Sequence, residues 1–224
     1  MYAWLLVLAF ATPVPPELEK ARDAQDRAVL DRLAGQYSAA AQQKPNDADA
    51  HYRSALAQSY VAEVAIEVRD NQKAREAAET GIKAAERAVA LNGSSSEYHR
   101  ILGTLCGQVI PAAKLAGITR GRCALDEVNR ALQLDSKAAV NYISRGVGNY
   151  YLPSGFGGGI DLAIKDFQKA IELDPKSAEA HLWLGISLRK AGRNADARKA
   201  LQVALELNPQ RAWTKQQLEK TPAK

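Results

Sequence analysis

The chain has 224 residues, of which 46% are hydrophobic and 25% charged, so neither a disordered chain nor a bundle of membrane helices fits. Only 6% of the residues are aromatic and alanine is frequent, which favours closely packed helices over a β-sandwich. The net charge of +5 arises near the C-terminus, where nine basic and three acidic residues lie from Arg189 to the end. Such a bias without base-reading or stacking groups indicates a solvated helix face, and we expect no nucleic-acid partner.

The N-terminus begins with an apolar run from Trp4 to Phe10, followed by an Ala-x-Ala pattern that ends at Ala11. This pattern predicts a signal peptide over residues 1–11 and a Pro-rich linker over residues 12–17. The run is too short to span a bilayer, so we expect an exported, periplasmic protein and not an integral membrane protein. No Lys or Arg precedes the run, which leaves a buried N-terminal helix in a cytoplasmic protein as the alternative.

A short motif recurs along the chain at 88–93, 131–136, 170–175 and 204–209, with Pro175 and Pro209 separated by 34 residues. Within the last repeat, counted from Ala178, Gly185 and Ala197 are the small residues that would let two helices approach closely. Large apolar residues such as Leu188 and Leu201 flank them, and Pro209 would stop the second helix. A fixed period of this length indicates stacked helical hairpins.

These residues resemble the tetratricopeptide repeat (TPR) family, whose period is the same. Leu184 and Gly185 match repeat positions 7 and 8, Ala197 matches position 20, and Pro209 matches position 32. Earlier copies keep the Gly and Ala landmarks but insert residues between them. In the first hairpin the extra residues 61–79 stay periodic without Pro or Gly, so we expect both of its helices to be lengthened.

The resemblance implies an all-α fold, a right-handed α-solenoid of TPR-like helical hairpins with a C-terminal capping helix. We expect a helical domain over residues 18–220 and no β-strand. Its expected parts are a helix over 18–43, hairpins over about 48–92, 94–135, 137–174 and 177–208, and a capping helix over 210–220.

In TPR proteins the first helix of each repeat lines a concave groove, and the resemblance implies partner-binding residues at the matching positions. These are Arg100, Thr104, Gln108, Val140, Ile143, Val147, Tyr150, Tyr151, Leu182, Ile186, Arg189 and Lys190, with Phe156 added from a Gly-rich insertion. Such a groove suits an extended peptide or an apolar ligand with a charged end. Alternatively, Tyr150 and Tyr151 pack beneath the Gly-rich loop at 153–159.

No catalytic constellation or metal-ligand spacing occurs, so we expect no catalytic residue, metal or cofactor. Two of the three histidines, His99 and His181, occupy the same repeat position, which favours a packing role. The loop at 153–159 lacks the Lys-Ser/Thr of a phosphate-binding loop and follows a helix. Cys106 and Cys123 are either a disulfide or two buried thiols on neighbouring helices.

The first functional hypothesis is a non-enzymatic scaffold that binds a protein or peptide in its groove. The second is a periplasmic small-ligand-binding protein similar to the TPR component of TRAP transporters, and an enzyme is the third. An open trough would favour the first, whereas a closed apolar pocket beside Tyr150, Tyr151 and Phe156 would favour the second. The pattern names neither the partner nor the oligomeric state.

Overall fold

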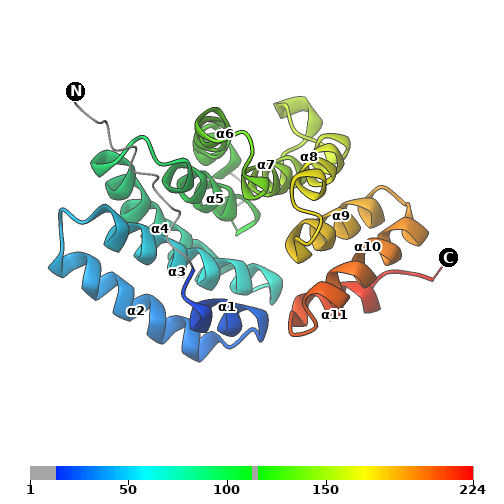
Figure 1. Ribbon diagram of the computed structural model, residues 1–224, viewed down its shortest axis with the longest axis horizontal. Helices are drawn as coiled ribbons and strands as arrows, with labels where there is room; N and C mark the ends of the chain where they lie inside the picture. Colours follow the sequence, from blue (N-terminus) through cyan, green and yellow to red (C-terminus); the bar gives the residue numbers. More distant parts are fainter. Residues whose placement is uncertain (1–13, 113–115, 224) are drawn as a thin grey trace, which may run out of the picture.

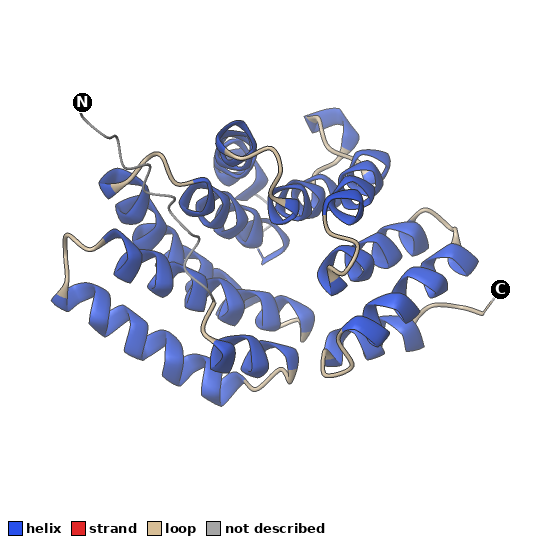
Figure 2. Cartoon of the chain, in the orientation of Figure 1, coloured by secondary structure: helices blue, strands red, loops and turns tan. Residues whose placement is uncertain are grey.

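The computed structural model describes residues 14–112 and 116–223, and this part of the chain is helical without any β-strand (Figures 1 and 2). The fold class predicted from the sequence, a solenoid of helical hairpins, is confirmed. The helices are α1 (Pro16–Asp23), α2 (Arg27–Gln43), α3 (Ala48–Glu67), α4 (Asn71–Leu91), α5 (Ser96–Ala112), α6 (Ala116–Leu134), α7 (Ala139–Tyr151), α8 (Ile160–Leu173), α9 (Ala178–Lys190), α10 (Asn194–Leu207) and α11 (Ala212–Glu219), with a 3-10 turn at Ser154–Phe156.

Four hairpins, α3–α4, α5–α6, α7–α8 and α9–α10, stack in chain order within the expected ranges. The stack curves, so that α11 at the end of the domain lies opposite α1 and the end of α3 (Figure 1). As expected, the first hairpin is long: α3 has 20 residues and α4 has 21, whereas α9 has 13 and α10 has 14.

The helix expected over 18–43 is in fact two helices, α1 and α2. Gln25 between them has a left-handed backbone conformation, with φ 54°, that ends α1. Asp26 then begins α2, because its side chain accepts a hydrogen bond of 3.1 Å from the Val29 amide. The signal peptide predicted at 1–11 lies outside the described residues. The predicted linker ends earlier than expected, since α1 starts at Pro16, where proline is well suited to a first turn.

Close contact between the two helices of a hairpin depends on glycine. An added Cβ at Gly185 would lie 2.6 Å from Cγ of Leu201, and one at Gly146 would lie 2.6 Å from the Phe167 ring. Gly103 has the same relation to Val128, again at 2.6 Å. The regular glycines of the sequence pattern therefore lie where two backbones approach, as predicted.

The buried apolar side chains form two main clusters rather than one. The first belongs to α1–α6 and includes Leu56 and Leu105, and the second belongs to α7–α11 and includes Phe167 and Trp183. Each hairpin packs mainly on its neighbours. The interior of the curve therefore lies between the two clusters, and side chains from both clusters face it.

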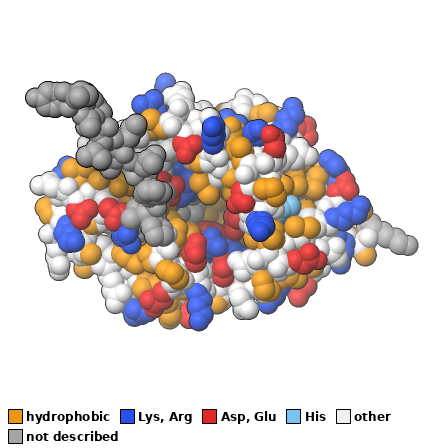
Figure 3. All heavy atoms as spheres, in the orientation of Figure 1, with side chains coloured by type: hydrophobic (Ala, Val, Ile, Leu, Met, Phe, Trp, Pro, Cys, Tyr) orange, Lys and Arg blue, Asp and Glu red, His pale blue; other side chains and the backbone are white. Residues whose placement is uncertain are grey.

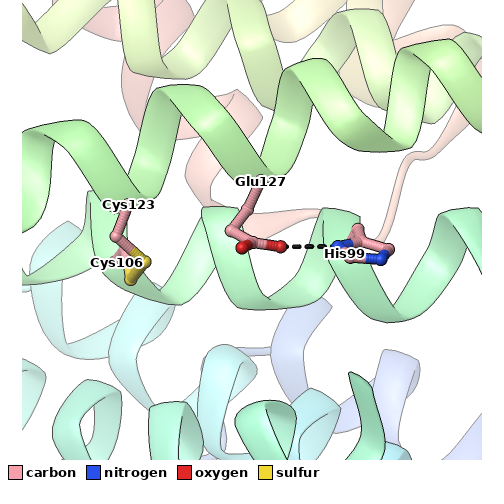
Figure 4. The surroundings of a disulfide bond; sticks show 4 residues. All are labelled: His99, Cys106, Cys123 and Glu127. Atoms are coloured by element: carbon pink, nitrogen blue, oxygen red, sulfur yellow. Dashed lines mark hydrogen bonds and ion pairs between the residues drawn. A yellow bond between two sulfur atoms is a disulfide. The ribbon is translucent and has the colours of Figure 1, made fainter. Parts of the chain in front are cut away.

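The histidines share a structural role. In each case Nε2 lies at hydrogen-bond distance from the carbonyl oxygen six residues earlier, and the pairs are His51–Pro45, His99–Gly93 and His181–Pro175. His99 also contacts Glu127 through Nδ1 at 2.6 Å (Figure 4). The histidines thus fix the loops between hairpins, in agreement with their equivalent repeat positions.

Cys106 and Cys123 are joined by a disulfide that links α5 to α6, with the two Cα atoms 6.0 Å apart (Figure 4). This separation lies in the normal range for a disulfide. Of the two alternatives left open by the sequence, the structure contains the bonded one.

Gly185→Ala is expected to lower the free energy of unfolding by about 1–3 kcal/mol, because the new methyl group meets Leu201 and the Ala197 carbonyl. The matched control is Gly35→Ala in α2, where an added Cβ meets nothing within 4 Å. There alanine should be neutral or stabilise the helix by up to about 1 kcal/mol. Urea denaturation followed by circular dichroism measures both. Equal stabilities for the two variants would contradict the close packing at Gly185.

Reduction of the disulfide is expected to lower the free energy of unfolding by roughly 3 kcal/mol, because the bond closes a loop with a sequence separation of 17. The comparison is thermal melting with and without a reductant. The Cys106→Ala/Cys123→Ala double variant should melt like the reduced protein and should not respond to the reductant. A wild-type midpoint that is insensitive to reductant would refute the bond.

Candidate binding site: a central cavity

A cavity of about 380 Å³ lies inside the curve, between the two apolar clusters. The side of the molecule drawn in Figure 3 is hollowed near its centre, with charged side chains around the hollow. The first helices of all four hairpins, α3, α5, α7 and α9, contribute to the cavity wall, together with residues of α1, α6 and α11. One of its lining residues, Val140, is 47% exposed, so the cavity communicates with the surface.

Most of the wall is apolar and aromatic. The side chains that provide it are Leu56, Tyr60, Ile101, Val128, Ile143, Val147, Tyr151, Trp183 and Trp213. The aromatic rings support one another: the ring centroid of Trp183 lies 5.1 Å from that of Trp213 and 6.2 Å from that of Tyr151. Such a rigid surface favours the binding of an apolar group.

The three arginines of the wall are already paired with carboxylates. Arg100 donates to Glu97 at 2.5 and 2.7 Å. Arg22 pairs with Asp23 at 2.7 Å, and Arg145 pairs with Asp166 at 2.6 Å. The polar amide of Gln108 donates to the Ser59 carbonyl at 3.1 Å, but its buried Oε1 has no hydrogen-bond donor.

A buried arginine at the N-cap of α11 joins the two ends of the solenoid. Arg211 is 1% exposed, and it donates to Glu67 and, at 2.7 Å, to Glu63, both on α3. Its Nε lies 3.7 Å from a carboxylate oxygen of Asp23 and 3.9 Å from one of Glu179. Further polar contacts between the ends join Asn208 to Asp23 at 2.7 Å and Gln216 to Gln25 at 2.9 Å.

Burial changes the ionisation of these carboxylates. It raises the pKa of Glu63 to about 7, although the guanidinium groups of Arg22 and Arg211 oppose the shift. Burial likewise raises the pKa of Glu67, again against Arg211. At Glu97 the outcome is reversed: burial is outweighed by the Arg100 guanidinium, which holds the pKa of that carboxyl below its ordinary value.

The structure brings part of the predicted groove together. The predicted residues that line the cavity are Arg100, Thr104, Gln108, Val140, Ile143, Val147 and Tyr151. They come from α5 and α7, the first helices of the two middle hairpins. Tyr150 does not line the cavity, and its ring instead packs against Tyr151 and Trp183.

The predicted residues from α9 lie elsewhere. Leu182 and Ile186 are 1% and 3% exposed, because Trp213 and Leu218 of α11 belong to the same apolar cluster. Arg189 donates to the backbone carbonyl and side chain of Gln217 in α11. The capping helix therefore occupies the part of the groove that the repeat pattern assigned to a partner.

Two further predicted residues also lie away from the cavity. Lys190 lies over the Tyr150 ring, with Nζ 4.0 Å from the centroid, and donates to the Tyr150 carbonyl. Phe156 is 72% exposed at the tip of the loop between α7 and α8 and does not face the cavity wall. The Gly-rich loop thus carries its phenyl ring outward.

Sequence reasoning missed the charged end of the cavity. Its residues are Arg22, Glu63, Glu67, Glu179 and Arg211, with Trp183 and Trp213 beside them. One signal was present: Glu63 and Glu67 are spaced by one helical turn within an otherwise apolar stretch from 61 to 68. Nothing in the repeat pattern indicates that Arg211 crosses to α3.

Within residues 14–112 and 116–223, no three His, Cys, Asp or Glu side chains are grouped so as to hold a metal ion. No helix in that part of the chain combines the length and apolarity that a membrane span needs.

Comparison with known proteins supports the repeat assignment. Residues 156–212 match the tetratricopeptide repeat family, and this segment contains the hairpin α9–α10 and all of α8. No curated protein matches the chain at a significant level.

Solved structures show the fold. A thermophilic TPR protein from Thermus thermophilus is similar with a TM-score of 0.64 and 16% identity, over 90% of this chain and 97% of that one. MamA from Desulfovibrio magneticus has a TM-score of 0.46 and 15% identity, over 89% of this chain and 99% of that one. YrrB, described as a TPR protein with an unusual peptide-binding site, has a TM-score of 0.44 and 18% identity, with 91% of each chain covered. The match to the Thermus thermophilus protein shows that the architecture of this chain is a TPR-type solenoid.

Glu63→Gln should stabilise the protein more at pH 8 than at pH 5. The raised pKa of Glu63, about 7 against an ordinary 4.5, means that the folded wild type binds a proton in this interval that the unfolded chain has released. Its stability therefore falls as the pH rises from 4.5 to 7. Glutamine does not titrate, so the free energy of unfolding of the variant relative to wild type should rise by roughly 1–3 kcal/mol from about pH 5 to about pH 8.

Urea denaturation at several pH values measures this difference. The control is Glu206→Gln, which changes an exposed carboxyl of α10 and should show no such trend. A difference that stays constant for Glu63→Gln would contradict the burial of its charge.

Proposed function

We propose that this chain is a non-enzymatic interaction module that binds an extended peptide segment of a partner protein in its central cavity. The observation that carries the proposal is that the first helices of four successive hairpins all line one cavity. The TPR-type fold supports it, because such repeats generally serve protein interaction and present a concave surface for it. The apolar wall with a few polar groups is suited to side chains of an extended peptide.

A small apolar molecule is the second candidate ligand. The contacts of Arg211 with α3 favour it, since they bring the two ends of the solenoid together and enclose one side of the cavity. Tyr151 lines the cavity as this candidate requires, whereas Tyr150 and Phe156 do not. A peptide is preferred because residues from several successive hairpins line the cavity along the curve. Such a wall provides contacts for several side chains of an extended segment.

The proposal includes an exported, oxidising location, as the N-terminal sequence pattern predicts. The disulfide between Cys106 and Cys123 supports it, since such bonds persist mainly outside the cytosol.

Gly148→Phe should abolish peptide binding without unfolding the chain. Gly148 lines the cavity on α7, and an added Cβ there meets nothing within 4 Å, so the phenyl ring would fill the cavity. The probe is a library of random heptapeptides displayed on phage and selected against the immobilised wild-type protein. Enriched peptides are then synthesised and titrated while the fluorescence of Trp183 and Trp213 is followed. The variant should bind them at least about tenfold more weakly.

The matched control is Gly35→Phe on α2, where an added Cβ is also free of contacts and which does not line the cavity. It should bind the peptides like wild type. If the library yields no peptide that distinguishes wild type from Gly148→Phe, the cavity is not a peptide site.

A further inference from the structure

The charges around the cavity are not balanced. The three arginines of the wall are each paired with a carboxylate, as described above. Three other carboxylates of the wall, Glu63, Glu67 and Glu179, pair with the single guanidinium of Arg211, and the guanidinium of Arg22 also acts on Glu63. When Arg22 and Arg211 are counted with these carboxylates and Asp23, two positive charges stand against four negative ones, so this corner carries an excess of two negative charges. The chain as a whole carries +5, so the acidic corner does not follow from composition.

The guanidinium of Arg211 is sealed off, whereas two of its carboxylate partners remain accessible. The side chains of Arg211 and Glu67 are 2% and 1% exposed. Those of Glu63 and Glu179 are 19% and 25% exposed, and both line the cavity. A group that enters the cavity therefore meets carboxylate oxygens rather than the guanidinium of Arg211.

The surroundings suit a cation on an apolar stem. The rings of Tyr60, Tyr151, Trp183 and Trp213 line the cavity. Aromatic faces attract ammonium and guanidinium groups, most strongly where water is excluded. Burial raises the pKa of Glu63 more than the guanidinium groups of Arg22 and Arg211 lower it, so these two cations do not fully offset the cost of its charge. Gln108 adds an acceptor oxygen without a donor.

We propose that the bound segment inserts a lysine or arginine side chain into the cavity, with its charged end at Glu63 and Glu179. This inference rests on the proposed function and adds the chemistry of the ligand. The methylene stem lies along the apolar wall, and the cation offsets the excess negative charge of the acidic corner. A carboxylate ligand is disfavoured, because it would face the acidic corner while the arginines of the wall are already paired.

The test uses one peptide enriched from the library, synthesised with a lysine, a norleucine or a glutamate at its basic position. Norleucine keeps the apolar stem and removes only the charge. For the wild-type protein, tryptophan fluorescence should give a dissociation constant about tenfold or more lower for lysine than for norleucine, with glutamate the weakest.

The variant Glu63→Gln/Glu179→Gln should bind the lysine and norleucine peptides with affinities that differ by less than about threefold. Binding of the norleucine peptide itself should be unchanged, which shows that the cavity is intact. The control Glu206→Gln should keep the full preference for lysine, since its carboxyl is exposed on α10.

The outcomes separate the two proposals. Peptides that bind in the cavity without a preference for a basic residue, or a preference that survives the double variant, would overturn the inference and leave the proposed function standing. If no peptide binds, the proposed function fails, and the inference with it. Hexylammonium is titrated in parallel: binding of this amine in the absence of any peptide binding would favour the small-ligand alternative and also overturn the inference.

Discussion

The architecture depends on one buried guanidinium. A solenoid of hairpins is an open stack in which each unit contacts its neighbours, and nothing in that plan joins its ends. Here Arg211 of the last helical segment reaches Glu63 and Glu67 of α3 and the backbone carbonyl of Arg22. The apolar clusters of the two halves remain separate, so the contact between the ends is made by polar groups. Because buried ion pairs lose much of their attraction to desolvation, this junction fixes a geometry more than it adds stability.

The junction is possible because the first hairpin is long. α3 has 20 residues and α9 has 13, so at about 1.5 Å per residue α3 extends roughly 10 Å further. Glu63 and Glu67 lie in this extension, which carries them across the interior of the curve to α11. The insertion that breaks the regular repeat is thus what brings carboxylates from the N-terminal half to an arginine of the C-terminal half, and it gives the cavity its charged end.

The sequence was sufficient for the fold because the repeat pattern records local contacts. Gly185 and Leu201 lie in one hairpin and are in contact. The 34-residue repeat already predicts a small residue at the first position and a large one at the second. The turn at Gln25 was missed, since a left-handed residue other than glycine leaves no pattern in the sequence. The cavity was predicted where it follows repeat positions, on α5 and α7. Its acidic corner was not, because residues 144 and 148 positions apart in the chain form it through the curvature of the whole stack.

The different roles of regular and irregular repeats follow from the same geometry. The hairpin α9–α10 matches the family pattern best, yet Leu182 and Ile186 on its inner helix are covered by α11. The hairpins that depart from the period provide most of the cavity wall, with residues such as Glu63 on α3 and Tyr151 on α7. The inner face of α9 serves packing because α11 lies against it. The equivalent repeat positions on α5 and α7 line the cavity instead. In this chain, therefore, the capping helix decides which of the equivalent inner faces can meet a ligand, and the long first hairpin adds the charged residues that no repeat position specifies.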